Sequence, residues 1–125
     1  MTTTAQDSSL PIAITMGDPA GVGPEILART MASTTEAPDA LQRSDTRWIL
    51  VGTRWALDKG AACIGQALPA LKIIDAPANA EPGWNLLDLG IPEPEDFRFG
   101  QVQARCGELA VQAVEWAATR CLQGE

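Results

Sequence analysis

The sequence IAITMGDPAGVGPEI at residues 12–26 combines a short apolar run, a glycine-rich turn and the start of a helix. The apolar run from Leu10 to Met16 is typical of a strand that is covered on both faces. Pro24 fits the first position of a helix, where its missing N–H would have no partner in any case. The stretch therefore predicts a strand, a tight loop and a helix. The loop would lie at the carboxyl end of the strand, where open α/β sheets bind ligands.

Two common glycine-rich motifs do not fit this loop. A P-loop would close on Gly-Lys-Ser or Gly-Lys-Thr, whereas this loop closes on Gly23, Pro24 and Glu25. A dinucleotide fingerprint needs a third glycine in register and an acidic residue after the next strand, where this chain has LVGTR at residues 50–54. The residues therefore do not predict a P-loop or a Rossmann site.

The residues from Thr15 to Glu25, TMGDPAGVGPE, resemble the amino-terminal signature of the 4-hydroxythreonine-4-phosphate dehydrogenase family of vitamin B6 biosynthesis. They are similar, more loosely, to the Gly-Asp-Gly-Ile-Gly-Pro-Glu opening of isopropylmalate and isocitrate dehydrogenases, which share that fold. The end of the chain also resembles the family's long helix just before its next strand, at Gly107, Ala110, Ala117 and the closing Gly124 and Glu125. The resemblance spans nearly the whole chain but only the front part of the family's length.

This resemblance implies an α/β fold, with a parallel or mixed sheet and flanking helices, like the first part of the isopropylmalate-dehydrogenase-like fold. It also implies an activity, the NAD- or NADP-dependent oxidation, with decarboxylation, of 4-phosphooxy-threonine in pyridoxal phosphate biosynthesis. The family uses a divalent metal (Zn, Mg or Mn) to polarise the hydroxyl while hydride leaves to nicotinamide. Its members are cytoplasmic homodimers, and some relatives act on other hydroxy acids or on dihydrodiol dicarboxylates.

In the related dehydrogenases this loop lies beside the cofactor in the interdomain cleft. The resemblance therefore implies cleft-lining, cofactor-side roles for Gly17, Asp18, Pro19, Gly21 and Gly23. A structural alternative is an Asx turn, in which the Asp18 carboxylate bonds the amides of residues 20 and 21. Glu25 is expected to face the positive end of the helix dipole and not to act as an acid.

No catalytic or metal-binding residue can be carried over to this chain. The family's metal-binding histidines and its lysine, asparagine and arginine contacts to the substrate phosphate fall later in its sequence, and this chain has no histidine. We therefore expect the chain alone to be inactive. The alternative is that it is a truncated, non-catalytic fragment that serves at most in binding.

Composition narrows the classes of partner and compartment. The net charge of -7 argues against nucleic acid or an anionic membrane as a partner. No apolar run approaches the ~18 residues of a membrane span, and residues 1–9 are expected to be a disordered tail before an incomplete domain at 10–125. Three cysteines without a C-x-x-C pair indicate buried thiols in a reducing cytoplasm, at Cys63, Cys106 and Cys121.

The order of elements predicts a parallel sheet with right-handed crossovers, because strands and helices alternate. Helices are expected at 24–33, 54–64 and 102–122, strands at 47–52, 71–75 and 85–89, and surface connections at 34–46 and 90–100. Thr53 is expected to cap the second helix and Gly65 to end it. Arg54 could meet an anion, although exposed arginines are common there. The tryptophans and phenylalanines are expected to pack in the core or at an interface.

The last helix has one polar stripe and an apolar arc wider than a surface helix needs. Gly107 disfavours a helix, so we expect the helix to start after it or another segment to approach it closely. If later segments complete the sheet in the family, this chain has an open sheet edge and an unpartnered helix. It is then expected to self-associate.

Overall fold

The computed structural model describes residues 10–36, 46–101 and 103–124. The predicted tail at 1–9 and most of the predicted connection at 34–46 lie outside the described residues. The elements are, in chain order, β1 (Ile12–Thr15), α2 (Gly23–Glu36), β2 (Arg47–Gly52), α4 (Arg54–Ile64), β3 (Lys72–Ile74), the 3₁₀ helix η1 (Pro77–Asn79), β4 (Gly83–Asp88) and α5 (Ala104–Leu122). All expected helices and strands are present, with bounds shifted by a few residues.

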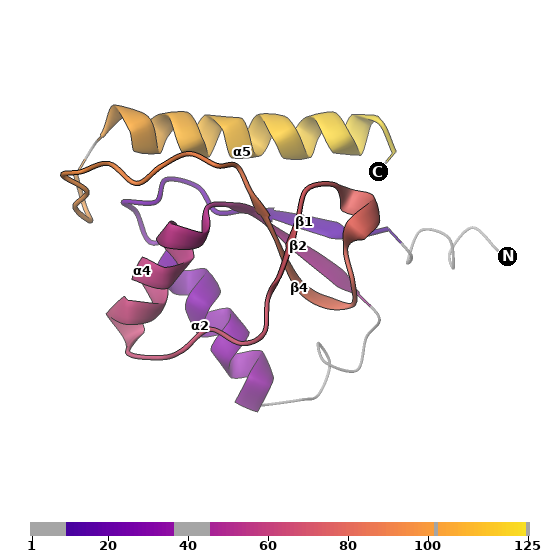
Figure 1. Cartoon of the computed structure of the whole chain (residues 1–125), viewed down its shortest axis with the longest axis horizontal. Helices are drawn as coiled ribbons and strands as arrows, with labels where there is room; N and C mark the ends of the chain where they lie inside the picture. The colour runs from indigo at the N-terminus through magenta and orange to yellow at the C-terminus, as the bar shows by residue number, and fades with distance from the viewer. Residues whose placement is uncertain (1–9, 37–45, 102, 125) are drawn as a thin grey trace, which may run out of the picture.

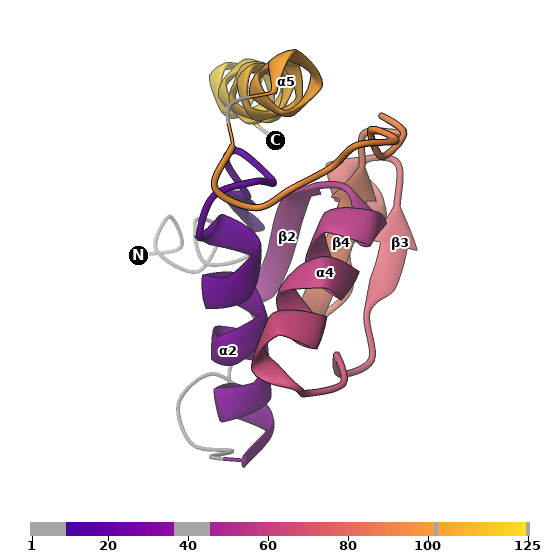
Figure 2. The ribbon, with the colours of Figure 1, turned by 90° about the vertical axis from the view of Figure 1, so that its left-hand side faces the viewer.

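The strands form one four-stranded sheet in the order β1-β2-β4-β3. Every neighbouring pair is parallel, which narrows the prediction of a parallel or mixed sheet to a parallel one. α2 and α4 lie side by side against one face, and α5 lies on the other side of the sheet, along β1 and β2 (Figures 1 and 2). The predicted α/β class is therefore confirmed.

Alternation along the central strand β2 divides its side chains between two apolar clusters. Leu50 packs with Met31 of α2 and Leu57 of α4 on one face. Ile49 and Val51 pack on the other face with residues that include Ala113 of α5. All are almost fully buried. The continuous apolar run at 48–51 is thus the signature of a strand covered on both sides.

The connection between β3 and β4 is unusually short for two parallel neighbours, which commonly need a crossover of a dozen or more residues with a helix. It contains only η1, and the fully buried side chain of Asn85 in β4 holds it in place. Asn85 Nδ2 donates to the carbonyls of Glu81 (2.8 Å) and Trp48 (3.0 Å), and its Oδ1 accepts from the Glu81 amide at 3.0 Å. One side chain thus bonds both backbone groups of Glu81 in this connection and ties it to β2.

Two expectations about single residues were wrong. Gly107 lies inside α5, and a Cβ built on it would meet no other atom within 4 Å. Of the three cysteines only Cys106 is buried, whereas Cys63 and Cys121 are exposed. In both cases the helix period places the residue away from the sheet, and residues as small as glycine and cysteine give little sign in a sequence of which way they face. None of the helices in the described part of the chain has the length and apolar character that a membrane crossing needs.

The open surroundings of Gly107 lead to a test. Replacing Gly107 by alanine should stabilise the chain by about 0.5–1 kcal/mol, because alanine loses less backbone entropy in a helix and meets no clash here. Gly65 ends α4 at φ 66° and provides the matched control. Gly65→Ala should destabilise by about 1 kcal/mol, because a Cβ is strained in that left-handed conformation. Urea unfolding followed by circular dichroism measures both. Equal signs for the two variants would contradict this account.

Candidate functional site

The glycine-rich loop follows β1 at the carboxyl edge of the sheet, as predicted. Gly17 turns the chain with φ 77°, a conformation that glycine adopts without strain. The Asp18 carboxylate accepts a hydrogen bond from the Ala20 amide at 2.8 Å, and the Asp18 carbonyl accepts one from the Gly21 amide at 2.9 Å. The Asx turn considered for Asp18 is therefore present for the Ala20 amide, whereas the Gly21 amide bonds the main-chain carbonyl and not the carboxylate. One carboxylate oxygen of Asp18 is used within the loop.

Gly23 has a packing role. It lies at the start of α2, where the loop returns so close to β1 that a Cβ on residue 23 would overlap the carbonyl oxygen of Met16. A second close approach follows at once, because a Cβ on Gly60 of α4 would lie 2.5 Å from the backbone of Pro24. These two glycines allow the start of α2 to pack closely against both the end of β1 and α4.

The loop is partly covered by the segment 91–101, which we call the strap. The Gly100 amide donates to the Ala20 carbonyl at 2.7 Å, and Pro19 and Ala20 are buried. Cys106 of α5 lies against the same turn, where burial chiefly, and also the charge of Asp18, raise the pKa of its thiol. Of the five candidate residues only Gly21 is exposed, next to Val22 at 65% exposure, whereas Gly17, Asp18 and Gly23 are half-buried. The most accessible part of the loop is thus its tip, at the amino end of α2.

A topological switch point of the sheet lies between β2 and β4, because β2 connects to α4 on one face and β4 to α5 on the other. Ligands often bind at such a switch point. Here Asp88 fills it. The Asp88 carboxylate accepts from the Arg54 amide at 3.3 Å and from the Gly90 amide at 2.8 Å. A negative charge of the protein itself therefore occupies the amino end of α4.

Asp88 also corrects the prediction for Thr53. Thr53 precedes α4, but its side chain makes no capping hydrogen bond, and its buried Oγ1 has no partner among the described residues. The Arg54 guanidinium pairs with Asp58 at 3.1 Å. The sequence gave one sign that a residue other than Thr53 could cap α4, namely the carboxylate of Asp88 near the end of the fourth predicted strand.

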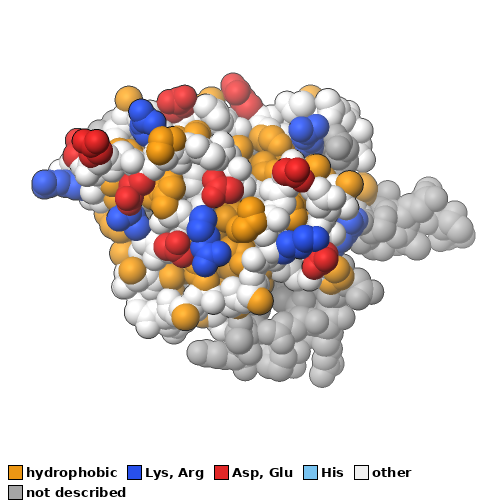
Figure 3. All heavy atoms as spheres, in the orientation of Figure 1, with side chains coloured by type: hydrophobic (Ala, Val, Ile, Leu, Met, Phe, Trp, Pro, Cys, Tyr) orange, Lys and Arg blue, Asp and Glu red, His pale blue; other side chains and the backbone are white. Residues whose placement is uncertain are grey.

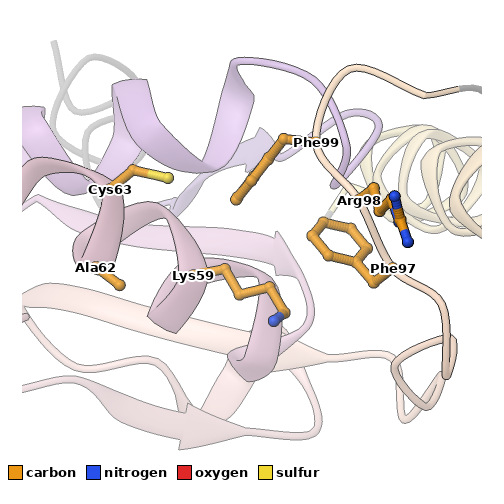
Figure 4. Close-up of a pocket in the computed structure, with 6 residues that line it drawn as sticks. All are labelled: Lys59, Ala62, Cys63, Phe97, Arg98 and Phe99. Carbon is orange, nitrogen blue, oxygen red and sulfur yellow. The ribbon is translucent and has the colours of Figure 1, made fainter.

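A cavity of about 360 Å³ lies between α4 and the strap (Figure 4). It is lined by Lys59, Ala62, Cys63, Phe97, Arg98 and Phe99. Phe97 stands edge-to-face with both Trp55 and Phe99, so these aromatic residues pack as expected. The Lys59 ammonium lies 2.7 Å from Glu93 and 5.1 Å from the centre of the Phe97 ring. The charge of Lys59 is thus already compensated by Glu93. Most of the other lining side chains are apolar, so the cavity provides few groups that could act in a reaction.

The residues that the structure describes do not fit a divalent metal. The sequence has no histidine, and the described residues hold no group of three or more Cys, Asp or Glu side chains that could bind an ion. Nor does the loop fit a pyrophosphate, because Asp18 and Glu25 put negative charge beside the tip. On the face in Figure 3, basic and acidic side chains are interspersed, with no basic patch that nucleic acid would need.

The fold and the loop thus define a class, the parallel α/β proteins with a glycine-rich loop after the first strand. Comparison with known proteins agrees. The chain is 35% identical over 117 residues to D-threonate 4-phosphate dehydrogenase of Pectobacterium atrosepticum, and 33% identical over 118 residues to 4-hydroxythreonine-4-phosphate dehydrogenase of Geobacter metallireducens. These matches cover 91% and 90% of the chain. A scan against models of protein families finds no match.

A solved structure supports the same relationship. The crystal structure of 4-hydroxythreonine-4-phosphate dehydrogenase from Klebsiella pneumoniae superposes with a TM-score of 0.71 and 35% identity over 93% of this chain. The chain spans about a third of the length of these relatives, 34% and 32% of the two sequences and 34% of the crystal structure. The resemblance to the 4-hydroxythreonine-4-phosphate dehydrogenase family is thereby confirmed, over a length consistent with an amino-terminal portion.

Proposed function

We propose that this chain is the amino-terminal, incomplete part of an α/β dehydrogenase domain. The complete enzyme would use NAD or NADP and a divalent metal to oxidise, with decarboxylation, 4-phosphooxy-threonine in pyridoxal phosphate biosynthesis. We propose it to be a cytoplasmic homodimer. The observation that carries this proposal is the similarity to phosphorylated hydroxy-acid dehydrogenases over nine-tenths of the chain, at 35% identity in the first comparison.

The contribution of this chain to such an enzyme is one wall of the cleft. The exposed tip at Gly21 and Val22 would face the nicotinamide side of the cofactor. Unlike the pyrophosphate, that side does not need a positively charged partner. Gly17, Asp18, Pro19 and Gly23 would support that tip by fixing the turn and its return to α2. The metal, which polarises the alcohol when bound, would be held by residues outside this chain.

A second substrate is favoured by the name of the relative at 35% identity, which is a D-threonate 4-phosphate dehydrogenase. The two substrates share a 4-phosphate ester and a secondary alcohol, and they differ at carbon 2, which bears an amine in one and a hydroxyl in the other. The tip residues Gly21 and Val22 carry no charged group that would read this difference, and the nearby carboxylates of Asp18 and Glu25 are bound to the Ala20 amide and to Arg29. Residues in the remaining two-thirds of the enzyme would therefore distinguish the two substrates.

Two measurements test the proposal. The chain alone, titrated with NAD or NADP and assayed with Mg²⁺, Mn²⁺ or Zn²⁺, should show no alcohol oxidation. Turnover would contradict the proposal that its metal ligands lie elsewhere. A chimera in which residues 10–122 replace the matching third of the Pectobacterium relative should oxidise D-threonate 4-phosphate. A folded chimera without activity, beside an active parent, would favour the non-catalytic alternative.

A further inference from the structure

The strap leads from β4 toward α5 and contacts both α4 and the glycine-rich loop. Near its end, the Gly100 amide donates to the Ala20 carbonyl at 2.7 Å. Ala20 is buried and directly precedes the exposed tip at Gly21 and Val22. A change in the position of residue 100 would therefore be passed to the tip through main-chain atoms.

Trp55 of α4 attaches the strap twice. Near the start of the strap, Trp55 Nε1 donates to the Ile91 carbonyl at 2.9 Å. Further along, the ring of Phe97 stands edge-to-face with Trp55, at 5.2 Å between the ring centres. The Lys59 ammonium of α4 lies 5.1 Å from the centre of the same ring, and Figure 4 shows the ring directed from the strap toward α4. Phe97 thus holds on α4 the part of the strap that leads to Gly100.

The side chain of Gln103 fixes the turn in which Phe97 lies. Gln103 Oε1 accepts from the Arg98 amide at 3.3 Å, and Gln103 Nε2 donates to the Asp96 carbonyl at 3.0 Å. The residues on both sides of Phe97 are therefore held by one side chain. Gly100 follows Phe97 by three residues, which span at most about 10 Å. The position of the Phe97 ring thus restricts where the Gly100 amide can lie.

We propose that Phe97 is a positioning residue for the dehydrogenase reaction. By holding the strap on α4, it maintains the hydrogen bond between Gly100 and Ala20 and so fixes the tip of the loop beside the cofactor. Phe97 acts through Gly100 and is not a catalytic residue. The link from Phe97 to the loop concerns the chain as it stands, whereas its consequence for the cofactor rests on the proposed function.

The neighbouring aromatic residue does not hold the strap in the same way. Phe99 is nearer to Gly100 in the sequence, but its ring is 42% exposed. Its ring packs edge-to-face on Phe97, at 5.1 Å between the centres. Phe97 therefore lies between Phe99 and α4, and the loss of Phe99 leaves the contact of Phe97 with Trp55 in place. Phe99 provides a matched control on the same segment.

The ion pair between α4 and the strap cannot replace the aromatic contact. The Lys59 ammonium lies 2.7 Å from the Glu93 carboxylate, but the two side chains are 37% and 40% exposed. Solvent screens such a pair, and exposed ion pairs contribute little to stability. Aromatic pairs that are partly buried hold their geometry more firmly. We therefore assign the positioning to Phe97 and not to Glu93.

The reactivity of Cys106 tests the link between Phe97 and the loop. Cys106 is 1% exposed and lies against Gln103 and the turn at residues 18–20. In a chain with Cys63→Ser and Cys121→Ser, which removes the two exposed thiols, the measured quantity is the rate of its reaction with 5,5′-dithiobis(2-nitrobenzoate). Phe97→Ala should raise this rate at least about 10-fold, because the strap and loop open more often. Phe99→Ala, and Phe97→Tyr, which keeps the ring, should change it by less than about threefold.

Urea separates a local opening from a loss of overall stability. If the strap opens locally, the rate for Phe97→Ala should be nearly independent of urea at low concentration, since little surface is exposed. If Phe97 only stabilised the whole chain, the rate would follow global unfolding, which circular dichroism measures, at every urea concentration. That result would overturn the inference. An unchanged rate in Phe97→Ala, or an equal rise in Phe99→Ala, would overturn it as well.

The chimera with the Pectobacterium relative tests the consequence for the cofactor. Phe97→Ala should raise the KM for the nicotinamide cofactor at least about 10-fold and leave the KM for D-threonate 4-phosphate within about threefold. This split is expected because we propose that the contacts to the substrate phosphate lie outside this chain. An active chimera whose cofactor KM does not respond to Phe97→Ala would overturn the positioning role. An inactive chimera would count against the proposed function, and the thiol rates would then decide the link from Phe97 to the loop by themselves.

Discussion

Replacing Gly23 by alanine is expected to destabilise the chain by about 3 kcal/mol. The added Cβ would overlap the carbonyl oxygen of Met16, which is backbone and cannot rotate away. Relief requires the loop and the start of α2 to move away from β1, and this movement would also disturb the contact of Pro24 with Gly60. For a domain with a total stability of about 5–15 kcal/mol, the loss is large. Urea unfolding followed by circular dichroism measures it.

Gly21→Ala is the matched control for this prediction. A Cβ on Gly21 would lie 3.3 Å from the Asp18 carbonyl oxygen, at an exposed position that a small shift can relieve. We expect a loss of less than about 1 kcal/mol. If both variants lose the same stability, Gly23 is not a packing residue, and its place in the motif must be explained by a ligand alone.

The elements of this fold could be predicted because each has a local signal. The glycine loop and Pro24 mark the passage from β1 to α2, and Gly65 ends α4 in the left-handed conformation expected of it. The apolar run of β2 predicts a strand buried on both faces, and it is. Such signals depend on neighbours within a few residues, so a single sequence contains them.

Contacts between distant residues had no such signal. Asp88 caps α4 from the neighbouring strand β4, a role that the sequence assigned to the adjacent Thr53. Asn85 was expected only as one residue of a short strand, yet it holds the connection that makes β3 and β4 parallel neighbours. Each of these roles depends on where another strand ends, which is known only once the sheet order is known.

The candidate site shows the same division. The sequence located the loop, and the Asx turn of Asp18 was one of the two roles considered for that residue. The sequence could not predict which residues of the loop pack and which remain accessible, because this depends on how the strap and α5 cover the loop. Pro19 is buried and Gly23 meets β1, so much of the motif is explained by packing, whereas the tip at Gly21 remains accessible. A role of this loop beside a cofactor therefore concerns the tip first.

Replacing Asn85 by aspartate is expected to destabilise the chain by about 3 kcal/mol or more. The change keeps the oxygen that accepts from the Glu81 amide but replaces the donor with a second oxygen. That oxygen would face the carbonyls of Glu81, Trp48 and Gly83, which Asn85 Nδ2 approaches at 2.8, 3.0 and 3.3 Å. A buried negative charge among carbonyl oxygens has no compensating partner. Thermal and urea unfolding should both report the loss.

Asn79→Asp makes the same chemical change in the same connection and serves as the control. Asn79 is exposed and its side chain donates to Asp75 at 2.6 Å, so the variant places two carboxylates together in water. Solvent screens such a pair, and we expect a loss of at most about 1 kcal/mol. If Asn85→Asp were no less stable than Asn79→Asp, the short crossover would not depend on the amide of Asn85. In that case the burial of Ile74 of β3 and of Ala80 in the apolar cluster would have to hold β3 beside β4 without the hydrogen bonds of Asn85.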